Sequence, residues 1–305
     1  MATLIDEGRV LIEVGLNEVA TKSENPNVPY GPDEVATDIV ACAAAGAAVV
    51  HFHARTDDGA QAKTDDGIYR RAMELAAERT DVLMWPTAFP LGGRASSADE
   101  LPHHWALVDN PPAGAPLRIG ALDAWRIGRR PFIAADDSIR PMIKEGFGPA
   151  DRPYALPEAI AKMYDVGLLP TYCCYEMGDV RWVREMASRG IIPSLVRLEV
   201  LLYDGWLYGP TPGPAAIDAF LSEWDRSLDA ELTVVPYGVT DPDKYEGLLR
   251  YSLEKGVNIR VGVGDCPLAF PESSNSDLVR WACEIAADFR LTPATSKDVR
   301  ERFAL

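Results

Sequence analysis

The sequence predicts an α/β protein with a (β/α)8 barrel, the TIM barrel, in a single domain over residues 1–305. Two observations carry this prediction. A unit of helix, glycine and short apolar strand recurs along the chain, and eight apolar or β-branched runs alternate with helical patterns. The length of 305 residues exceeds the roughly 250 that one such barrel needs, so no second domain is required.

The recurring unit appears as VACAAAGAAVVHFH, AKMYDVGLLPTYCCY, REMASRGIIPSLVRLEV and YSLEKGVNIRVGVGD. A glycine just past a helix adopts the left-handed conformation, which lets the chain reverse within a few residues. Each unit therefore predicts a helix that leads into a strand. The eight predicted strands are residues 10–16, 47–53, 82–87, 117–122, 168–175, 193–201, 232–237 and 257–263.

Helical patterns lie between these strands. In residues 64–79, Ile68 and Ala72 fall on one face, and Thr64 is the predicted N-cap. Pro32, followed by two acidic residues, opens another helix. Eight strands that alternate with helices imply parallel pairing by right-handed crossovers, and that number suits closure into a barrel. An open, doubly wound sheet is the alternative.

Three long segments, near residues 88–100, 124–153 and 203–216, are predicted to be βα loops. Each follows a predicted strand. In a barrel they would therefore overhang the C-terminal face, where active sites lie.

The composition excludes several classes of protein. A net charge of −16 argues against a nucleic-acid surface, which needs clustered Lys and Arg. No stretch reaches the roughly 18 uninterrupted apolar residues of a membrane span, and the N-terminus lacks the apolar run of a signal peptide. Five cysteines without framework spacing fit a reducing compartment. We expect a cytoplasmic protein that binds neither nucleic acid nor membrane.

The stretch VVHFHARTDDG holds two of the four histidines, His51 and His53, at the end of the second predicted strand. Strand side chains alternate, so both rings share one face and Phe52 points the other way, towards the helices. Two imidazoles in this arrangement can bind one divalent metal. The alternative is a pair of hydrogen-bonded histidines that lines the barrel.

Two charged residues belong to the last predicted strand and the turn that follows it. Asp265 follows two glycines, where its carboxylate can serve as general base or metal ligand, or as a turn or helix-cap residue. Arg260 shares one face with those glycines. If that face is inward, Arg260 is a buried cation that needs a carboxylate, from substrate or from Glu18 or Glu199.

Several of these segments together resemble the β-keto acid cleavage enzymes, often called 3-keto-5-aminohexanoate cleavage enzymes. They are Asn17-Glu18 after the first strand, residues 25–34 (NPNVPYGPDE), AGAAVVHFHARTDDG, the segment NIRVG at 258–262, and LTPATSKDVRERF near the C-terminus. The resemblance spans most of the chain, strongly in the first ninety residues and weakly in the middle.

The resemblance implies a zinc-dependent (β/α)8 barrel that assembles as a homo-oligomer, usually a tetramer. Such enzymes convert a β-keto acid and acetyl-CoA into acetoacetate and a new acyl-CoA by a retro-Claisen route. Carried over to this sequence, His51 and His53 would bind zinc and Glu18 would contact substrate. Asp265 would be the catalytic aspartate and Arg260 would position it. Zinc would act as a Lewis acid on the keto oxygen.

This chain departs from the family pattern at several positions. The family has a glutamate, its third zinc ligand, where this chain has Gly264. The third ligand is therefore open, with Asp265, Glu199 and Glu176 as candidates. If the position is vacant, Gly264→Glu should raise zinc affinity.

The substrate contacts of the family have changed as well. Of the serine and glycines that hold the substrate carboxylate in the family, Thr87 alone retains a hydroxyl here. The glycine-rich loop after strand six is replaced by LYDGWLYGPTPG, and acidic residues of strand five by Thr171 and Cys173. These changes predict an altered substrate. Two alternatives stay open: a metal-dependent hydrolase or aldolase that needs no CoA, and a non-catalytic ligand-binding relative.

Overall fold

The computed structural model describes residues 2–87, 101–123, 131–133, 139–141, 156–207 and 209–305. Within them, eight parallel strands pair in the order β4-β3-β2-β11-β10-β9-β8-β5. Their bounds are β2 Ile12–Gly15, β3 Val49–Phe52, β4 Leu83–Pro86, β5 Ile119–Asp123, β8 Leu169–Cys174, β9 Val196–Tyr203, β10 Ala230–Tyr237 and β11 Asn258–Val261. The end strands β4 and β5 contact each other, so the sheet closes into a barrel. Both the eight strands and the barrel are confirmed.

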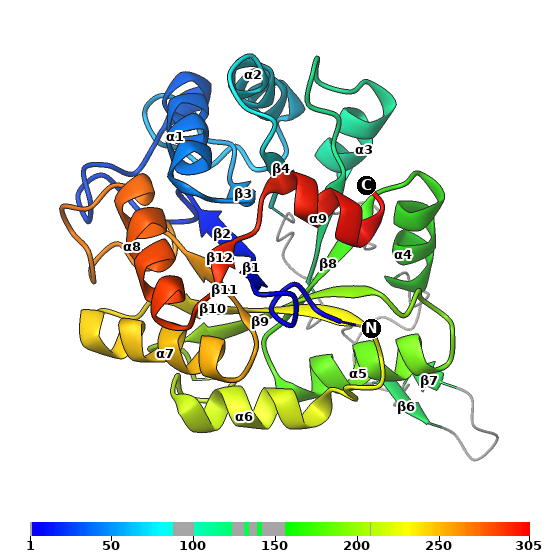
Figure 1. Cartoon of the computed structure of the whole chain (residues 1–305). Helices are drawn as coiled ribbons and strands as arrows, with labels where there is room; N and C mark the ends of the chain where they lie inside the picture. Colours follow the sequence, from blue (N-terminus) through cyan, green and yellow to red (C-terminus); the bar gives the residue numbers. More distant parts are fainter. Residues whose placement is uncertain (1, 88–100, 124–130, 134–138, 142–155, 208) are drawn as a thin grey trace.

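A ring of helices surrounds the strands (Figure 1). In chain order these are α1 Gly31–Ala45, α2 Asp66–Ala77, α3 Pro102–Asp109, α4 Leu156–Asp165, α5 Met177–Ser188, α6 Pro214–Glu223, α7 Pro242–Glu254 and α8 Asn275–Asp288. Their apolar faces pack on the outside of the barrel and form the core with it. In the described parts of the chain, no helix is both long and apolar enough to traverse a bilayer.

The starts of two helices test the capping predictions. Pro32 lies in the first turn of α1, as predicted. The prediction of Thr64 as the cap of α2 is wrong, because Asp65 is the N-cap and its side chain accepts a hydrogen bond from the Ile68 amide. A carboxylate satisfies the free amides and also favours the positive end of the helix dipole.

A short helix and a two-stranded sheet cover the N-terminal end of the barrel. β1 (Arg9–Val10) pairs with β12 (Thr292–Pro293), and α9 (Ser296–Phe303) follows across the end of the barrel nearest the viewer in Figure 1. Arg302 of α9 forms ion pairs with Asp229 and Glu231 at the start of β10. This end is tied together by structural contacts, which leaves the opposite end for chemistry.

The predicted βα loops are only partly within the described residues. Residues 88–100 lie outside them. The segment 124–153 was expected to be loop throughout, but it contains an antiparallel pair, β6 (Pro131–Ile133) and β7 (Ile139–Pro141), and its remainder lies outside the description. The segment 203–216, described except for residue 208, connects β9 to α6 at the C-terminal end of the barrel, as predicted.

At that C-terminal end, the backbones that follow β2 and β11 approach closely. The Gly264 amide donates to the Gly15 carbonyl over 3.2 Å. A Cβ at Gly264 would lie 2.5 Å from the Asn17 nitrogen and 2.8 Å from the Gly15 oxygen. Because both neighbours are backbone atoms, only glycine fits here without displacing the chain.

Candidate functional site

The end of β3 directs two histidines into the mouth of the barrel. His51 and His53 are both buried, at 4% and 3% exposure, and their ring centroids lie 5.4 Å apart. Phe52 between them points outward and packs against Tyr69 of α2. The alternation predicted from the sequence is therefore confirmed.

Glu18, from the loop after β2, lies between the two rings. Its Oε1 is 2.9 Å from His51 Nε2 and its Oε2 is 2.9 Å from His53 Nε2. Glu18 has a φ of 32°, in a region that residues other than glycine rarely adopt. Backbone strain of this kind persists where surrounding structure holds a residue for a function.

Hydrogen bonds on the far side of each ring fix which nitrogen carries the proton. His51 Nδ1 lies 3.2 Å from the Trp85 carbonyl, which can only accept, so Nδ1 donates. His53 Nδ1 lies 3.2 Å from Gln61 Oε1. The amide of Gln61 is oriented because its Nε2 donates to the Glu18 carbonyl over 2.7 Å. Nδ1 of each ring therefore donates, and a ring with its single proton on Nδ1 presents a bare Nε2 towards the carboxylate.

Two acceptors that face each other across 2.9 Å repel unless a proton or a cation lies between them. Burial lowers the pKa of His51 to about 4, so its ring is neutral near pH 7. Burial opposes ionisation of Glu18, yet its neighbours His53, His51 and Arg260 hold its pKa well below the usual range. The contribution of the two histidines requires a positive charge, a proton or a metal ion, between the rings and the carboxylate. A neutral imidazole beside an ionised carboxylate is the donor set of a divalent metal.

The described residues contain one group of this kind, formed by Glu18, His51 and His53. All three donor atoms lie within 4.8 Å of one another. Zinc binds imidazole nitrogen and carboxylate oxygen at about 2.0–2.2 Å, and catalytic zinc sites use three protein ligands and leave a fourth position open. The Gln61 side chain and the Trp85 carbonyl orient the two imidazoles. Such supporting contacts are usual around metal-bound histidines. The three residues fit a zinc ion.

A network of buried charged side chains surrounds this group. Arg260 belongs to an ion-pair network that joins two guanidinium groups, Arg197 and Arg260, to four carboxylates: Glu13, Glu18, Glu199 and Asp265. Fully ionised, the four carboxylates would exceed the two guanidinium groups by two negative charges. Burial raises the pKa of Glu13 and of Asp265 to about 8, so both favour the protonated form near pH 7. A divalent cation bound nearby would favour their ionised forms.

Arg260 and Asp265 form a bidentate pair, a contact consistent with the positioning role that the resemblance implied for Arg260. Arg260 Nε donates to Asp265 Oδ2 over 3.0 Å and Nη2 to Oδ1 over 2.8 Å. Nη2 also donates to Glu18, and Nη1 lies 3.6 Å from Glu199. Arg260 points into the barrel and is buried. It contacts both Glu18 and Glu199, the two protein carboxylates that the sequence offered as its partner.

The three carboxylates proposed from sequence as the third metal ligand are committed elsewhere. Asp265 is held by Arg260, and Glu199 accepts from Arg197 over 2.9 Å. Glu176 is the N-cap residue of α5. Glu18, to which the resemblance gave a substrate contact, is the carboxylate that lies between the two imidazoles. The gain expected from Gly264→Glu stays a prediction, and a side chain at that position would lie against backbone atoms of Gly15 and Asn17.

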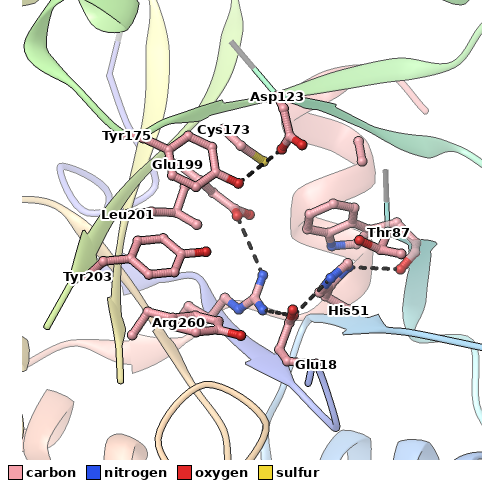
Figure 2. Close-up of a pocket in the computed structure, with 13 residues that line it drawn as sticks. Glu18, His51, Thr87, Asp123, Cys173, Tyr175, Glu199, Leu201, Tyr203 and Arg260 are labelled. Atoms are coloured by element: carbon pink, nitrogen blue, oxygen red, sulfur yellow. Dashed lines mark hydrogen bonds and ion pairs between the residues drawn. The ribbon is translucent and has the colours of Figure 1, made fainter. Parts of the chain in front are cut away.

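A cavity of about 50 Å³ opens beside the candidate metal group (Figure 2). That volume has room for about four water molecules, which suits the reacting end of a small substrate. Thr87, predicted to contact substrate, lines it together with Trp85. Its lining is Glu18, His51, Trp85, Thr87, Ala121, Asp123, Cys173, Tyr175, Glu199, Leu201, Tyr203, Tyr237 and Arg260.

Sequence reasoning missed several residues of the site. Glu13 and Arg197 are a buried ion pair inside the barrel, and Trp85 donates to Glu13 over 3.0 Å. The signal was available, because a charged residue within an apolar strand such as LIEVGL must find a partner. Gln61 gave no such signal, since in the sequence it lies in a loop well past the end of β3.

Comparison with known proteins places this architecture among enzymes. The family model for the β-keto acid cleavage enzymes matches residues 9–305. The 3-keto-5-aminohexanoate cleavage enzyme of Acetoanaerobium sticklandii is 31% identical over 285 residues, 92% of each chain. The enzyme of the same name from Fusobacterium nucleatum subsp. nucleatum is 35% identical over 80 residues, 26% of this chain and 28% of that relative.

Solved structures share the fold at low identity. The complex of ObcA with oxaloacetate has a TM-score of 0.65 and 14% identity, and covers 92% of this chain and 68% of that one. A type I 3-dehydroquinate dehydratase from Clostridium difficile has a TM-score of 0.52 and 8% identity, with 93% of each chain covered. At these identities the likeness supports the barrel alone. The family match and the full-length relative show that this chain is an enzyme of the β-keto acid cleavage family.

Proposed function

We propose that this enzyme uses zinc, held by Glu18, His51 and His53, to cleave a β-keto acid with acetyl-CoA as co-substrate. The products would be acetoacetate and a new acyl-CoA. The observation that carries the proposal is the pair of bare Nε2 atoms that face the Glu18 carboxylate at 2.9 Å. That arrangement needs a proton or a metal ion between the atoms, and a metal is what the chemistry of this family would use.

The names of similar proteins support the substrate class. The Acetoanaerobium relative is named for cleavage of 3-keto-5-aminohexanoate, a β-keto acid. ObcA structures contain oxaloacetate in one case, and a C4-CoA adduct with oxalate in another. A β-keto acid and a CoA thioester are therefore the substrates that we propose for this chain, with an altered acyl group because the pocket residues differ.

Each site residue would have a distinct task. Bound zinc would supply a Lewis acid at the keto oxygen. Asp265 would move a proton, since burial raises its pKa to about 8, near the working pH of a general base. Arg260 would position Asp265 through their two hydrogen bonds. The Thr87 hydroxyl would donate a hydrogen bond to the substrate. We propose a single-domain, cytoplasmic homo-oligomer, a tetramer by resemblance.

Two measurements on purified protein test this proposal. Elemental analysis should find close to one zinc per chain after purification without chelator. Incubation with acetyl-CoA and a panel of β-keto acids that differ in acyl chain should give acetoacetate and the matching acyl-CoA. A protein with neither metal nor turnover would refute the proposal. Turnover that does not depend on acetyl-CoA would instead favour a hydrolase or an aldolase on the same barrel.

A further inference from the structure

The cavity beside the candidate metal group is rich in acceptors. Glu18, Asp123 and Glu199 all line it with carboxylates. A β-keto acid, the substrate class proposed above on which this inference rests, brings a carboxylate of its own. An anion entering such a pocket needs hydrogen-bond donors, so the donors that remain uncommitted decide where its carboxylate can bind.

Arg260, the cation of the cavity, has no side free for a ligand. Nε and Nη2 both donate to Asp265, and Nη2 also donates to Glu18. Nη1 lies 3.6 Å from carboxylate oxygens of Glu13 and Glu199. An arginine whose three nitrogens all face protein carboxylates is a structural and positioning group, and a substrate carboxylate would compete with all of them.

Four further donors of the lining are also engaged. Trp85 Nε1 donates to Glu13 over 3.0 Å, and the Tyr175 hydroxyl donates to Asp123 over 3.0 Å. Cys173 Sγ lies 3.8 Å from the Thr171 carbonyl. His51 uses Nδ1 towards the Trp85 carbonyl. None of these is available to a ligand without breaking a contact within the barrel.

The hydroxyls of Tyr203 and Tyr237 differ from these four donors in their hydrogen bonding. The two tyrosines end the paired strands β9 and β10 in register, their rings stack with centroids 4.3 Å apart, and both line the cavity. No hydrogen bond ties either hydroxyl to the described residues. Figure 2 shows Tyr203 across the cavity from His51, with its hydroxyl directed inward. Burial raises the pKa of both phenols well above the ordinary value, so both keep their protons.

Aromatic rings pack around Tyr203, which suits recognition of a small group. The centroid of its ring lies 4.3 Å from that of Tyr237, 4.1 Å from that of Trp206 and 5.5 Å from that of Tyr175. A phenol fixed between neighbouring rings loses little conformational entropy when it binds a ligand.

We propose that the hydroxyls of Tyr203 and Tyr237 bind the carboxylate of the β-keto acid. They take the part that the resemblance gives to a serine and glycines after strand three, of which Thr87 alone retains a hydroxyl. Carboxylate recognition has thereby moved across the barrel mouth, from the end of β4 to the ends of β9 and β10. The specificity of this enzyme depends on that pair.

The test compares Tyr203→Phe, Tyr237→Phe and the double variant with the wild type, all loaded with zinc. Tyr251→Phe is the matched control, because that hydroxyl donates to Asp218 on the surface. Calorimetry measures binding of acetoacetate and of its methyl ester, which lacks the carboxylate. Each loss of a hydroxyl should weaken acetoacetate binding roughly tenfold. The double variant should no longer prefer the acid to the ester, while zinc content and fold stay unchanged.

Steady-state kinetics give a second readout. KM for the β-keto acid should rise in each single variant by more than kcat falls, since the hydroxyls hold a group that does not react. If the double variant binds acetoacetate as tightly as the wild type, the inference is wrong while the proposed function stands. A zinc-loaded wild type that neither binds acetoacetate nor turns over any β-keto acid would overturn both.

Discussion

His51 Nε2 and Glu18 Oε1 lie 2.9 Å apart, although each is an acceptor when the imidazole is neutral. The Trp85 carbonyl fixes the proton of His51 on the opposite nitrogen. A contact of this kind is unfavourable in a buried site unless a positive charge occupies the space between the two atoms. The same geometry recurs at His53, so a single cation would relieve both contacts.

Glu18→Gln should therefore weaken zinc binding by about 100-fold or more, beyond the 10- to 100-fold usual for changes in supporting residues. The amide keeps the shape of the side chain but removes the negative charge that a divalent metal needs. Competition with a chromogenic chelator measures the affinity. Asp265→Asn is the control and should bind zinc within a few-fold of the wild type, and the opposite ranking of the two variants would assign the ligand to Asp265.

Gln61→Leu should lower zinc affinity by roughly 10- to 100-fold without touching a ligand. The change removes the acceptor that holds His53 Nδ1 and so frees the ring to rotate. Gln61→Glu retains an acceptor for Nδ1 but loses the donor to the Glu18 carbonyl, so its affinity should lie between those of the wild type and the leucine variant. Equal affinities for the leucine variant and the wild type would mean that His53 needs no support from this residue.

Gly264→Ala should destabilise the protein by about 1–3 kcal/mol, because the new methyl group would lie 2.5 Å from the Asn17 nitrogen. Urea unfolding measures the loss. Gly247→Ala, in the open on helix α7, is the matched control and should be neutral or stabilising by up to about 1 kcal/mol. A Gly264→Glu protein as stable as the wild type, with tighter zinc binding, would contradict the close packing of these two loops.

Asp38 should make stability depend on pH. It accepts from Asn275 over 2.7 Å, and burial raises its pKa from 3.8 to about 6. A raised pKa in the folded state favours folding while the group is protonated. The contribution is complete below about pH 4 and is lost as the pH rises through about 6.

Because Asp38 is partly exposed, the effect should be roughly 1–2 kcal/mol. Asp38→Asn does not titrate at this position. The difference in unfolding free energy between wild type and variant should thus fall from pH 4 to pH 6 and level off above it. Parallel pH curves for the two proteins would show that Asp38 has an ordinary pKa.

The barrel and the two histidines could be predicted from sequence because both follow from periodicity. Glycine after each helix and alternation along each strand give the order of elements and the side to which His51 and His53 point. The third ligand could not be predicted this way. Glu18 lies past the end of β2 at a positive φ, where the alternation of strand side chains no longer applies.

The contacts inside the barrel were harder to predict from sequence, for a different reason. Glu13 and Arg197 are far apart in sequence and lie on strands that do not pair, yet their side chains meet inside the barrel. The sequence shows that each needs a partner and leaves the choice among several open. The pairing of Tyr203 with Tyr237 could likewise not be predicted from sequence, because it depends on the register of β9 and β10.

The close approach of Gly15 and Gly264 has a consequence for how such chains are compared. The C-terminal ends of adjacent strands lie close together in a closed barrel. A metal ligand can therefore come from the loop after either strand while the position of the metal stays the same. Alignment columns record the strand of origin and ignore this equivalence. A survey of the family that required a carboxylate at the column of Gly264 would discard this enzyme, whereas one that asked which oxygen lies beside the two imidazoles would keep it.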